Sequence, residues 1–222
     1  MFSNLKEEKK LWKRGFKRVA CLDEAGRGPL AGPVIAAAAM INLAKLKIKK
    51  TSVPRQEELK ILFREVKDSK KLTAKKREEL YNILIRTPAI EWGMGKVSEK
   101  VIDKINIFEA TKLAMKKAIT KLGKRPDFLI LDGNFRINLP FFQKSIIKAD
   151  QKVFSCSAAS IIAKVSRDRI MEKYDKKYPQ YGFKKHKGYP TAFHFKMLKK
   201  YGPCNIHRKT FWPVIKYKSI AR

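Results

Sequence analysis

Four carboxylates of this chain stand at the ends of short apolar runs, and this recurrence constrains the fold more than any other feature. Asp23 and Glu24 end the apolar run over residues 19–22, Asp132 ends the run in DFLILDG, and Asp150 ends KSIIKAD. Short continuous apolar runs between turn formers are typical of buried strands. Because neighbouring strands can end at one edge of a sheet, the pattern predicts that these four carboxylates gather there.

Helical patterns separate the predicted strands. Residues 33–41 form a further apolar run, which we expect beside residues 19–22, joined to it through a glycine-rich segment. Thr73 can cap a helix that Pro88 ends, and further helices are predicted from about residue 106 to residue 122 and over residues 157–176. Strands alternating with helices indicate an α/β fold with a mixed sheet.

The charge balance points to a polyanionic partner. The chain has 52 Lys and Arg residues against 20 Asp and Glu, a formal net charge of +32, which repels itself unless a polyanion binds. Nucleic acid is the first candidate and an anionic membrane the second. No apolar run reaches the roughly 20 residues of a membrane span, and the N-terminal residues contain no apolar signal core. We therefore expect a cytoplasmic protein with no membrane partner.

The cysteines fit a reducing compartment. Cys21, Cys156 and Cys204 lie far apart, and an odd number without a C-x-x-C pair predicts free thiols. The 222 residues contain no repeat and no flexible linker. We expect a main domain over residues 1–176 and a basic C-terminal extension over residues 177–222 packed on it. The basic segment 44–66 is interpreted either as an added nucleic-acid contact or as a solvated surface excursion.

A cluster of carboxylates predicts a metal site. Like charges held close together are tolerated only if one is protonated or if cations bind among them. Oxygen-only ligands favour Mg²⁺ or Mn²⁺, and two such ions about 4 Å apart can activate a water and stabilise the leaving oxygen of a phosphodiester. The alternative is that each acid caps a turn or a helix. Asp23 and Glu24 would face opposite ways in an ideal strand, so we expect a bend that leaves only one pointing straight into the site.

The segment GRGPLAG is a second candidate binding element. Its third glycine, Gly32, comes one residue too late for a dinucleotide fingerprint. A glycine-rich turn exposes backbone N–H groups, and Arg27 adds a fork of donors, so the turn can grip a sugar-phosphate. The alternative is a tight turn with a solvated arginine.

Several motifs together resemble bacterial ribonuclease HII. They are LDEAGRGPLAGPV, DSKKLT, LDGN, SAASIIAKVSRD, YPQYGFKKHKGYPTAFH and HRKTFWPV, in this order along residues 19–215. The resemblance implies a ribonuclease H-like fold, a mixed five-stranded sheet flanked by helices with the C-terminal extension. It also implies an endonuclease that cuts RNA–DNA hybrids, or duplex DNA containing ribonucleotides, on the 5′ side of a ribonucleotide, leaving 3′-hydroxyl and 5′-phosphate.

The resemblance also implies roles for individual residues. Its catalytic, metal-binding carboxylates fall on Asp23, Glu24, Asp132 and Asp150, with Mg²⁺ or Mn²⁺ as cofactor and a two-metal mechanism. Its substrate-binding residues fall on Gly26, Arg27, Gly28, Ser69, Lys70 and Tyr189, where Tyr189 helps to read the junction between ribonucleotide and deoxyribonucleotide. A monomer is expected. The chain departs from the family at Ala149, where a glycine usually precedes the last carboxylate, and at Cys21, where a small residue is usual.

Other residues are open to more than one interpretation. Asp168 shares a helix face with Ile161 and Val165, so it either approaches the site or pairs with a buried arginine, and we favour the structural role. His186, His194 and His207 lack the close pairing of a zinc site, so phosphate contact or packing is expected of each.

Two rival functions remain at the level of sequence. The first is a non-catalytic nucleic-acid-binding module, which the four strand-end carboxylates argue against. The second is a nuclease of the same fold acting on DNA, which Gly26–Gly28 and Tyr189 argue against.

Overall fold

A five-stranded mixed sheet lies at the centre of the computed structural model, which describes residues 4–46, 53–66, 69 and 71–220. The strand order is β3-β2-β1-β4-β5. The strands are β1 (Val19–Ala25), β2 (Val34–Ile41), β3 (Ile90–Val97), β4 (Phe128–Asp132) and β5 (Phe142–Ile146). β1, β2 and β3 pair antiparallel, whereas β4 is parallel to both β1 and β5. The predicted fold class is confirmed.

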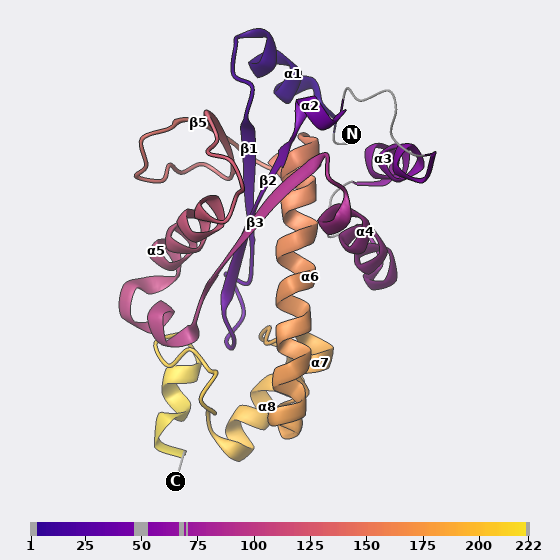
Figure 1. Ribbon diagram of the computed structural model, residues 1–222. Coiled ribbons are helices and arrows are strands. Elements are labelled where there is room, and N and C mark those ends of the chain that lie inside the picture. Colours follow the sequence, from indigo (N-terminus) through magenta and orange to yellow (C-terminus); the bar gives the residue numbers. More distant parts are fainter. Residues whose placement is uncertain (1–3, 47–52, 67–68, 70, 221–222) are drawn as a thin grey trace.

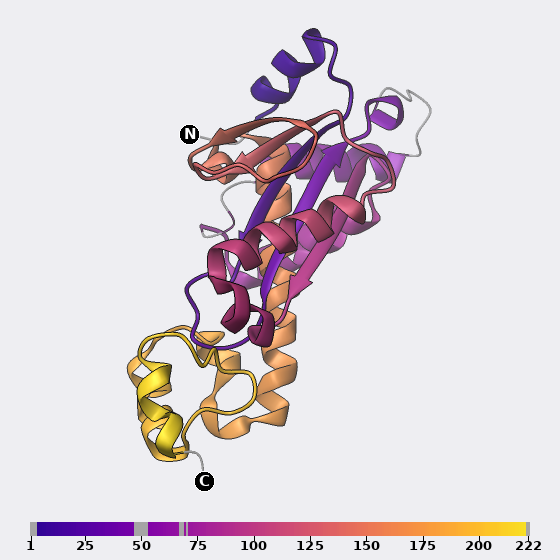
Figure 2. The same ribbon diagram turned by 90° about the vertical axis from the view of Figure 1, so that its left-hand side faces the viewer.

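Helices cover both faces of this sheet, because β2 is buried on both sides. Its odd-numbered residues from Ile35 to Ile41 pack against one set of helices, and its even-numbered residues from Val34 to Met40 pack against another. α5 (Glu99–Thr120) covers the even face, and α6 (Phe154–Lys177) covers the odd face together with α3 (Val53–Glu65) and α4 (Ala74–Arg86). Figure 2 shows α5 and α6 on opposite sides of the sheet.

Of the helices predicted over residues 73–88 and 106–122, the first is observed as expected and the second begins earlier. α4 begins as predicted, with the Thr73 side chain accepting a hydrogen bond from the backbone N–H of Lys76. α5, however, starts at Glu99 and is kinked at Asn106, which has a positive φ of 64°. The Asn106 side chain accepts from the backbone N–H groups of Phe108 and Glu109, so it caps the second part of α5. The predicted start near residue 106 is therefore the kink inside a longer helix.

The basic segment 44–66 is not wholly a solvated excursion. Its described part contains α2 (Leu43–Leu46) and α3, and Leu62 and Val66 are buried in the core beneath α4 and α6. The predicted strand at KSIIKAD is also displaced: β5 ends at Ile146, and Asp150 lies in the short 3-10 helix η1 (Ala149–Gln151).

The C-terminal residues pack at one end of α6. Three short elements follow α6, namely η2 (Pro179–Tyr181), α7 (Phe183–His186) and α8 (Ala192–Tyr201), and η3 (Val214–Ile220) ends the described chain. Figure 1 shows α7 and α8 beside the lower end of α6, near the turn that joins β1 to β2. At the opposite end of the sheet, α1 (Lys6–Lys13) pairs its Glu7 with Lys144 of β5.

Two smaller expectations can be compared with the structure. Cys21, Cys156 and Cys204 are free thiols, as predicted. No helix in the described part of the chain is long and apolar enough to cross a membrane.

Candidate active site

The pairing of β1 with β4 brings two of the predicted carboxylates together. Leu22 is paired with Leu131 in this parallel ladder, so the next residues along the two strands, Asp23 and Asp132, are neighbours. Alternation along each strand places both on the sheet face covered by α6. The segment after β5 adds Asp150 from η1.

Asp23, Asp132 and Asp150 form a group that can hold a metal ion. Each residue offers one carboxylate oxygen, and these oxygens lie within 4.8 Å of one another. Asp23 and Asp150 are buried. Burial raises the pKa of Asp23 well above its usual value, and the negative charges of Glu24 and Asp132 raise it further. A set of close, oxygen-only, mutually repelling ligands fits a hard divalent cation such as Mg²⁺ or Mn²⁺.

Glu24, the fourth predicted carboxylate, lies beside this group rather than within it. The β1 ladder continues through Ala25, which pairs with Ile35, so the expected bend after Asp23 is wrong. Alternation alone turns Glu24 away from Asp23, and a Glu24 side-chain oxygen lies 3.5 Å from an Arg27 guanidinium nitrogen. Glu24 is still close enough for its charge to affect the pKa of Asp23.

Hydrogen bonds from behind the group fix its orientation. The Ser160 hydroxyl of α6 donates to Asp23, and the backbone N–H of Ala149 donates to Asp132 at 2.8 Å. The hydroxyls of Ser69 and Ser160 are 2.7 Å apart, and Ser69 is only 2% exposed. This placement argues against a direct substrate contact by the Ser69 hydroxyl and makes Ser69 a support for Ser160. Lys70, predicted to bind substrate with Ser69, lies outside the described residues.

The glycine-rich turn between β1 and β2 is held by two buried arginines. Arg208 donates to the backbone carbonyls of Gly26, Arg27 and Gly32 at 2.5, 2.9 and 3.0 Å. Arg167 of α6 donates to three more carbonyls, those of Ala31, Pro33 and Lys187, each at 3.0 Å. Both side chains are at most 1% exposed.

These two arginines satisfy backbone groups instead of pairing with acids. Burial lowers the pKa of Arg167 to about 10 and that of Arg208 to about 9, but both guanidinium groups stay charged at neutral pH. Sequence reasoning gave neither residue a role, although Arg167 lies in SAASIIAKVSRD and Arg208 in HRKTFWPV, because a motif does not show which groups an arginine binds. The available signal was the turn itself, since buried carbonyls in an irregular segment require donors from elsewhere.

Tyr189 lies next to this turn. A Cβ added at Gly28 would be 3.7 Å from Tyr189 Cε1, and the Arg167 guanidinium carbon is 6.0 Å from the centre of the Tyr189 ring. The ring is 43% exposed. The structure therefore brings three predicted substrate-binding elements side by side: Gly26–Gly28, the exposed Arg27 side chain and the tyrosine.

The remaining candidates have structural partners. Asp168 pairs with Lys164 at 2.7 Å, so it is bound to a lysine one turn away and not to a buried arginine. His194 and His207 are buried and hydrogen-bonded to each other, which fits the packing role expected of them. Within the described residues, the three aspartates are the only His, Cys, Asp or Glu group identified as able to hold a metal ion.

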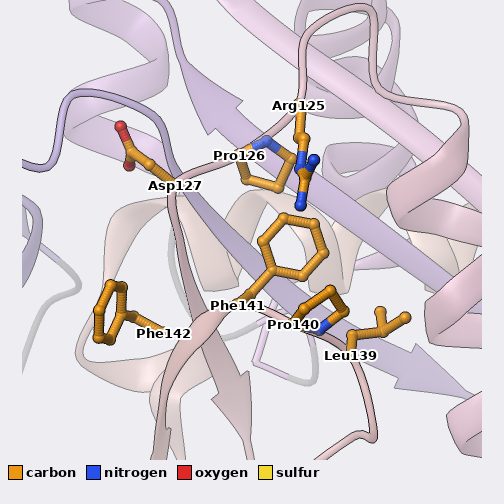
Figure 3. Close-up of a pocket in the computed structure, with 7 residues that line it drawn as sticks. All are labelled: Arg125, Pro126, Asp127, Leu139, Pro140, Phe141 and Phe142. Carbon is orange, nitrogen blue, oxygen red and sulfur yellow. The ribbon is translucent and has the colours of Figure 1, made fainter.

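A surface hollow at the far end of β4 is a poor alternative site. Arg125, Pro126, Asp127, Leu139, Pro140, Phe141 and Phe142 line it (Figure 3). Asp127 precedes β4, whereas Asp132 ends it. The Asp127 carboxylate already accepts hydrogen bonds from the backbone N–H groups of Lys17 and Arg18. The hollow therefore offers no carboxylate that is available for a metal or for catalysis.

Comparison with known proteins agrees with this geometry. The family model for ribonuclease HII matches residues 20–214. A ribonuclease HII of Chlamydia trachomatis serovar A is 49% identical over 203 residues, which is 90% of this chain and 85% of that protein.

Two solved structures share the fold. The ribonuclease H2 of Pyrococcus horikoshii has a TM-score of 0.68 and 30% identity, covering 91% of this chain and 98% of its own. Bst-RNase HIII in complex with Mn²⁺ has a TM-score of 0.63 and 19% identity, covering 92% of this chain and 70% of its own, and it supports the fold alone. The extent of the sequence matches confirms the resemblance seen in the motifs, and the chain belongs to the ribonuclease HII family of nucleases.

Proposed function

We propose that this chain hydrolyses the phosphodiester on the 5′ side of a ribonucleotide, in RNA–DNA hybrids or in duplex DNA with embedded ribonucleotides. The products are a 3′-hydroxyl and a 5′-phosphate. The observation that carries the proposal is that the cluster of aspartates and the glycine turn meet at the end of β1: Gly26, the first residue after β1, is three residues from Asp23, and Tyr189 lies beside Gly28. Cutting and reading the substrate can thus occur at one place.

Four carboxylates supply the catalytic part of the proposal. Asp23, Asp132 and Asp150 are the ligands of divalent cations, and Glu24 at the edge of the group completes the set. These residues would hold two divalent ions, which would supply an activated water molecule and stabilisation of the leaving oxygen. The hydrogen bonds from Ser160 and from the Ala149 backbone hold the carboxylates in place when substrate arrives.

The turn and the tyrosine supply recognition. An RNA–DNA junction differs from DNA by one 2′-hydroxyl, so discrimination requires hydrogen-bonding groups at that oxygen. Gly26 and Gly28 let the backbone approach closely because they lack side chains. The Tyr189 hydroxyl can bond the 2′-oxygen, and its ring can pack on the next sugar. Lys70 is retained from the sequence as a proposed phosphate contact.

The basic surface supplies affinity. A net charge of +32 neutralises several phosphates and releases their counterions, so binding weakens steeply with added salt. Residues 177–222 take part in recognition instead, through the exposed Tyr189 and through the buried Arg208 that holds the glycine turn.

Cleavage of a duplex carrying one ribonucleotide tests the catalytic part. We expect cleavage with Mg²⁺ and none with a chelator, and no cleavage of the all-DNA duplex. Asp23→Asn and Asp132→Asn abolish cleavage but leave duplex binding largely intact, because the basic surface is unchanged. Full activity in either variant would refute the metal site.

Substitution of Tyr189 tests recognition. We expect Tyr189→Phe to lose part of the activity and Tyr189→Ala much more, because phenylalanine keeps the ring and loses only the hydroxyl. Tyr201→Ala is the matched control, since Tyr201 is 44% exposed and Tyr189 43%. Equal cleavage by Tyr189→Ala and by the parent would place recognition elsewhere.

A further inference from the structure

Two buried histidines form a hydrogen-bonded pair behind Tyr189. His194 of α8 is 0% exposed and His207 is 1% exposed, and their Nε2 atoms are 3.0 Å apart. The pair connects two other groups, the backbone of Cys204 and the backbone carbonyl of Tyr189. Neither histidine belongs to the group of aspartates.

The two backbone groups at its ends fix the direction of every hydrogen bond in the series from Cys204 through the two histidines to Tyr189. The Cys204 N–H can only donate, and it lies 2.9 Å from His207 Nδ1, so Nδ1 is the acceptor and Nε2 carries the proton. His207 Nε2 therefore donates to His194 Nε2. His194 must then carry its proton on Nδ1, which donates to the Tyr189 carbonyl at 2.9 Å. Each imidazole is neutral, and each has one defined tautomer.

A third histidine holds the other side of the Tyr189 backbone. The His186 carbonyl accepts from the Tyr189 N–H at 2.9 Å, while His186 Nδ1 accepts from the Gly188 N–H at 3.1 Å. The His186 and His194 rings stack with centres 4.5 Å apart. The Tyr189 carbonyl also accepts from the Thr191 N–H at 2.9 Å. The peptide groups on both sides of Tyr189 are thus fixed, although its ring is exposed.

Burial keeps both histidines in the neutral state that this series of hydrogen bonds requires. It lowers the pKa of His194 to about 4 and that of His207 to about 3; the His186 charge contributes to both shifts, and the His194 charge contributes to that of His207. Both imidazoles remain neutral at physiological pH.

We propose that His207 and His194 are positioning residues that hold the Tyr189 side chain against the glycine turn for reading the junction. The inference rests on the proposed function, because it assigns the pair a task in the same site. His207 is adjacent to Arg208, which holds Gly26 and Arg27. Two consecutive residues of the C-terminal segment therefore support the recognition site. His207 supports Tyr189 through His194, and Arg208 supports the glycine turn directly.

A double-mutant cycle between His194 and Tyr189 tests the positioning role. The assay is single-turnover cleavage of a duplex with one ribonucleotide. We expect His194→Phe to lower the cleavage rate roughly tenfold to a hundredfold, the scale of a 1 Å misplacement. In the Tyr189→Ala background the same substitution should change the rate less than about twofold, because no ring remains to be positioned. In the control background Tyr201→Ala it should keep its full effect.

Conservative replacement separates positioning from mere folding. The Asn side-chain amide can replace the Nδ1 donor of His194, so His194→Asn should recover most of the rate even though it loses the bond to His207. Equal effects of His194→Phe in the parent and Tyr189→Ala backgrounds would overturn the inference.

Nitrogen-15 NMR of the parent protein gives a readout that needs no activity and no variant. We expect His207 protonated at Nε2 and His194 at Nδ1 at neutral pH, and the reverse assignment would overturn the inference. If the parent cleaved no ribonucleotide-containing duplex, the proposed function would fail. If the parent cleaved and depended on Tyr189 but the cycle was additive, only the positioning role would fail.

Discussion

Replacing Arg208 with methionine should destabilise the protein by removing the donors to the glycine turn. Methionine is unbranched and apolar, so it can occupy the space of the arginine stem without a charge, although it ends short of the guanidinium position. The carbonyls of Gly26, Arg27 and Gly32 then lose the Arg208 hydrogen bonds.

Two opposing contributions set the size of the effect. A buried acceptor left without a donor costs about 1–3 kcal/mol, so three such carbonyls cost about 3–9 kcal/mol. Removing a buried guanidinium recovers several kcal/mol of desolvation. We expect a net loss of about 2–4 kcal/mol in the free energy of unfolding. For a chain of this size the melting temperature falls by about 2–4 °C per kcal/mol, or roughly 5–15 °C in total.

Thermal and urea unfolding measure this loss directly. Arg64→Met is the control, because the Arg64 side chain is 73% exposed and its pair with Glu65 is worth about 0–1 kcal/mol. Arg208→Met should also lower the rate of single-ribonucleotide cleavage, since the turn is no longer held. A loss of stability no greater than that of Arg64→Met would refute the assignment of the turn's stability to Arg208.

Two further predictions concern the same end of the molecule. Gly26→Ala should destabilise the protein by more than about 2 kcal/mol, because Gly26 has a φ of +101° and a Cβ there would lie 2.2 Å from Arg167 Nε. Gly15→Ala is the control in the unfolding experiments, since Gly15 has a similar φ of +95° but nothing within 4 Å of an added Cβ. The free energy of unfolding should fall as the pH is lowered from about 6.5 toward 4, because the unfolded chain protonates His194 and His207 while the folded protein keeps them neutral, at up to about 1.4 kcal/mol per pH unit for each. Urea titrations at several pH values should show a shallower dependence in His207→Gln.

The cluster of three aspartates was predictable in large part because local sequence patterns position its members. Asp23 and Asp132 each follow an apolar run that is too short for a helix, and parallel strands with matched ends bring them together. Asp150 joins them from η1, after the end of β5. The sequence could not place Glu24, because whether β1 bends after Asp23 depends on its pairing with β2. The ladder continues to Ala25, so the side-chain alternation persists.

The elements that were missed lack a clear local pattern. β3 contains Gly93 and Gly95, which weaken the strand pattern. Their need is tertiary: a Cβ at Gly95 would lie 2.0 Å from the Ala114 carbonyl oxygen, because α5 packs directly on this strand. α3 was hidden in a lysine-rich segment, where Leu62 and Val66 are buried in the core and Ile61 and Phe63 pack against it.

The recognition site was predicted in part for the same reason. The glycines and Tyr189 belong to motifs that can be recognised in the sequence. Arg167 and Arg208 also lie in such motifs, but the motifs do not show what these arginines bind, since both act through backbone carbonyls that any sequence would supply. The motif residue Ser69 also has a contact that the sequence does not show, because its hydroxyl lies 2.7 Å from that of Ser160.

Adding Mg²⁺ should stabilise the folded protein, and the Asp132→Asn variant should lose that stabilisation. The three aspartate oxygens lie within 4.8 Å of one another, and the negative charge of Asp132 contributes to the raised pKa of Asp23. A cation that binds only the folded chain stabilises it by RT ln(1 + [L]/Kd), which is about 2.7 kcal/mol at a hundredfold excess over Kd. Asp132→Asn removes one negative charge, so without Mg²⁺ it should melt at a higher temperature than the parent. The parent should therefore melt at a lower temperature than Asp132→Asn without Mg²⁺ and at a higher temperature with Mg²⁺. An equal Mg²⁺ response in both would mean that the ion binds elsewhere on the chain, and a lower metal-free melting temperature for Asp132→Asn would mean that the hydrogen bond from Ala149 outweighs the repulsion.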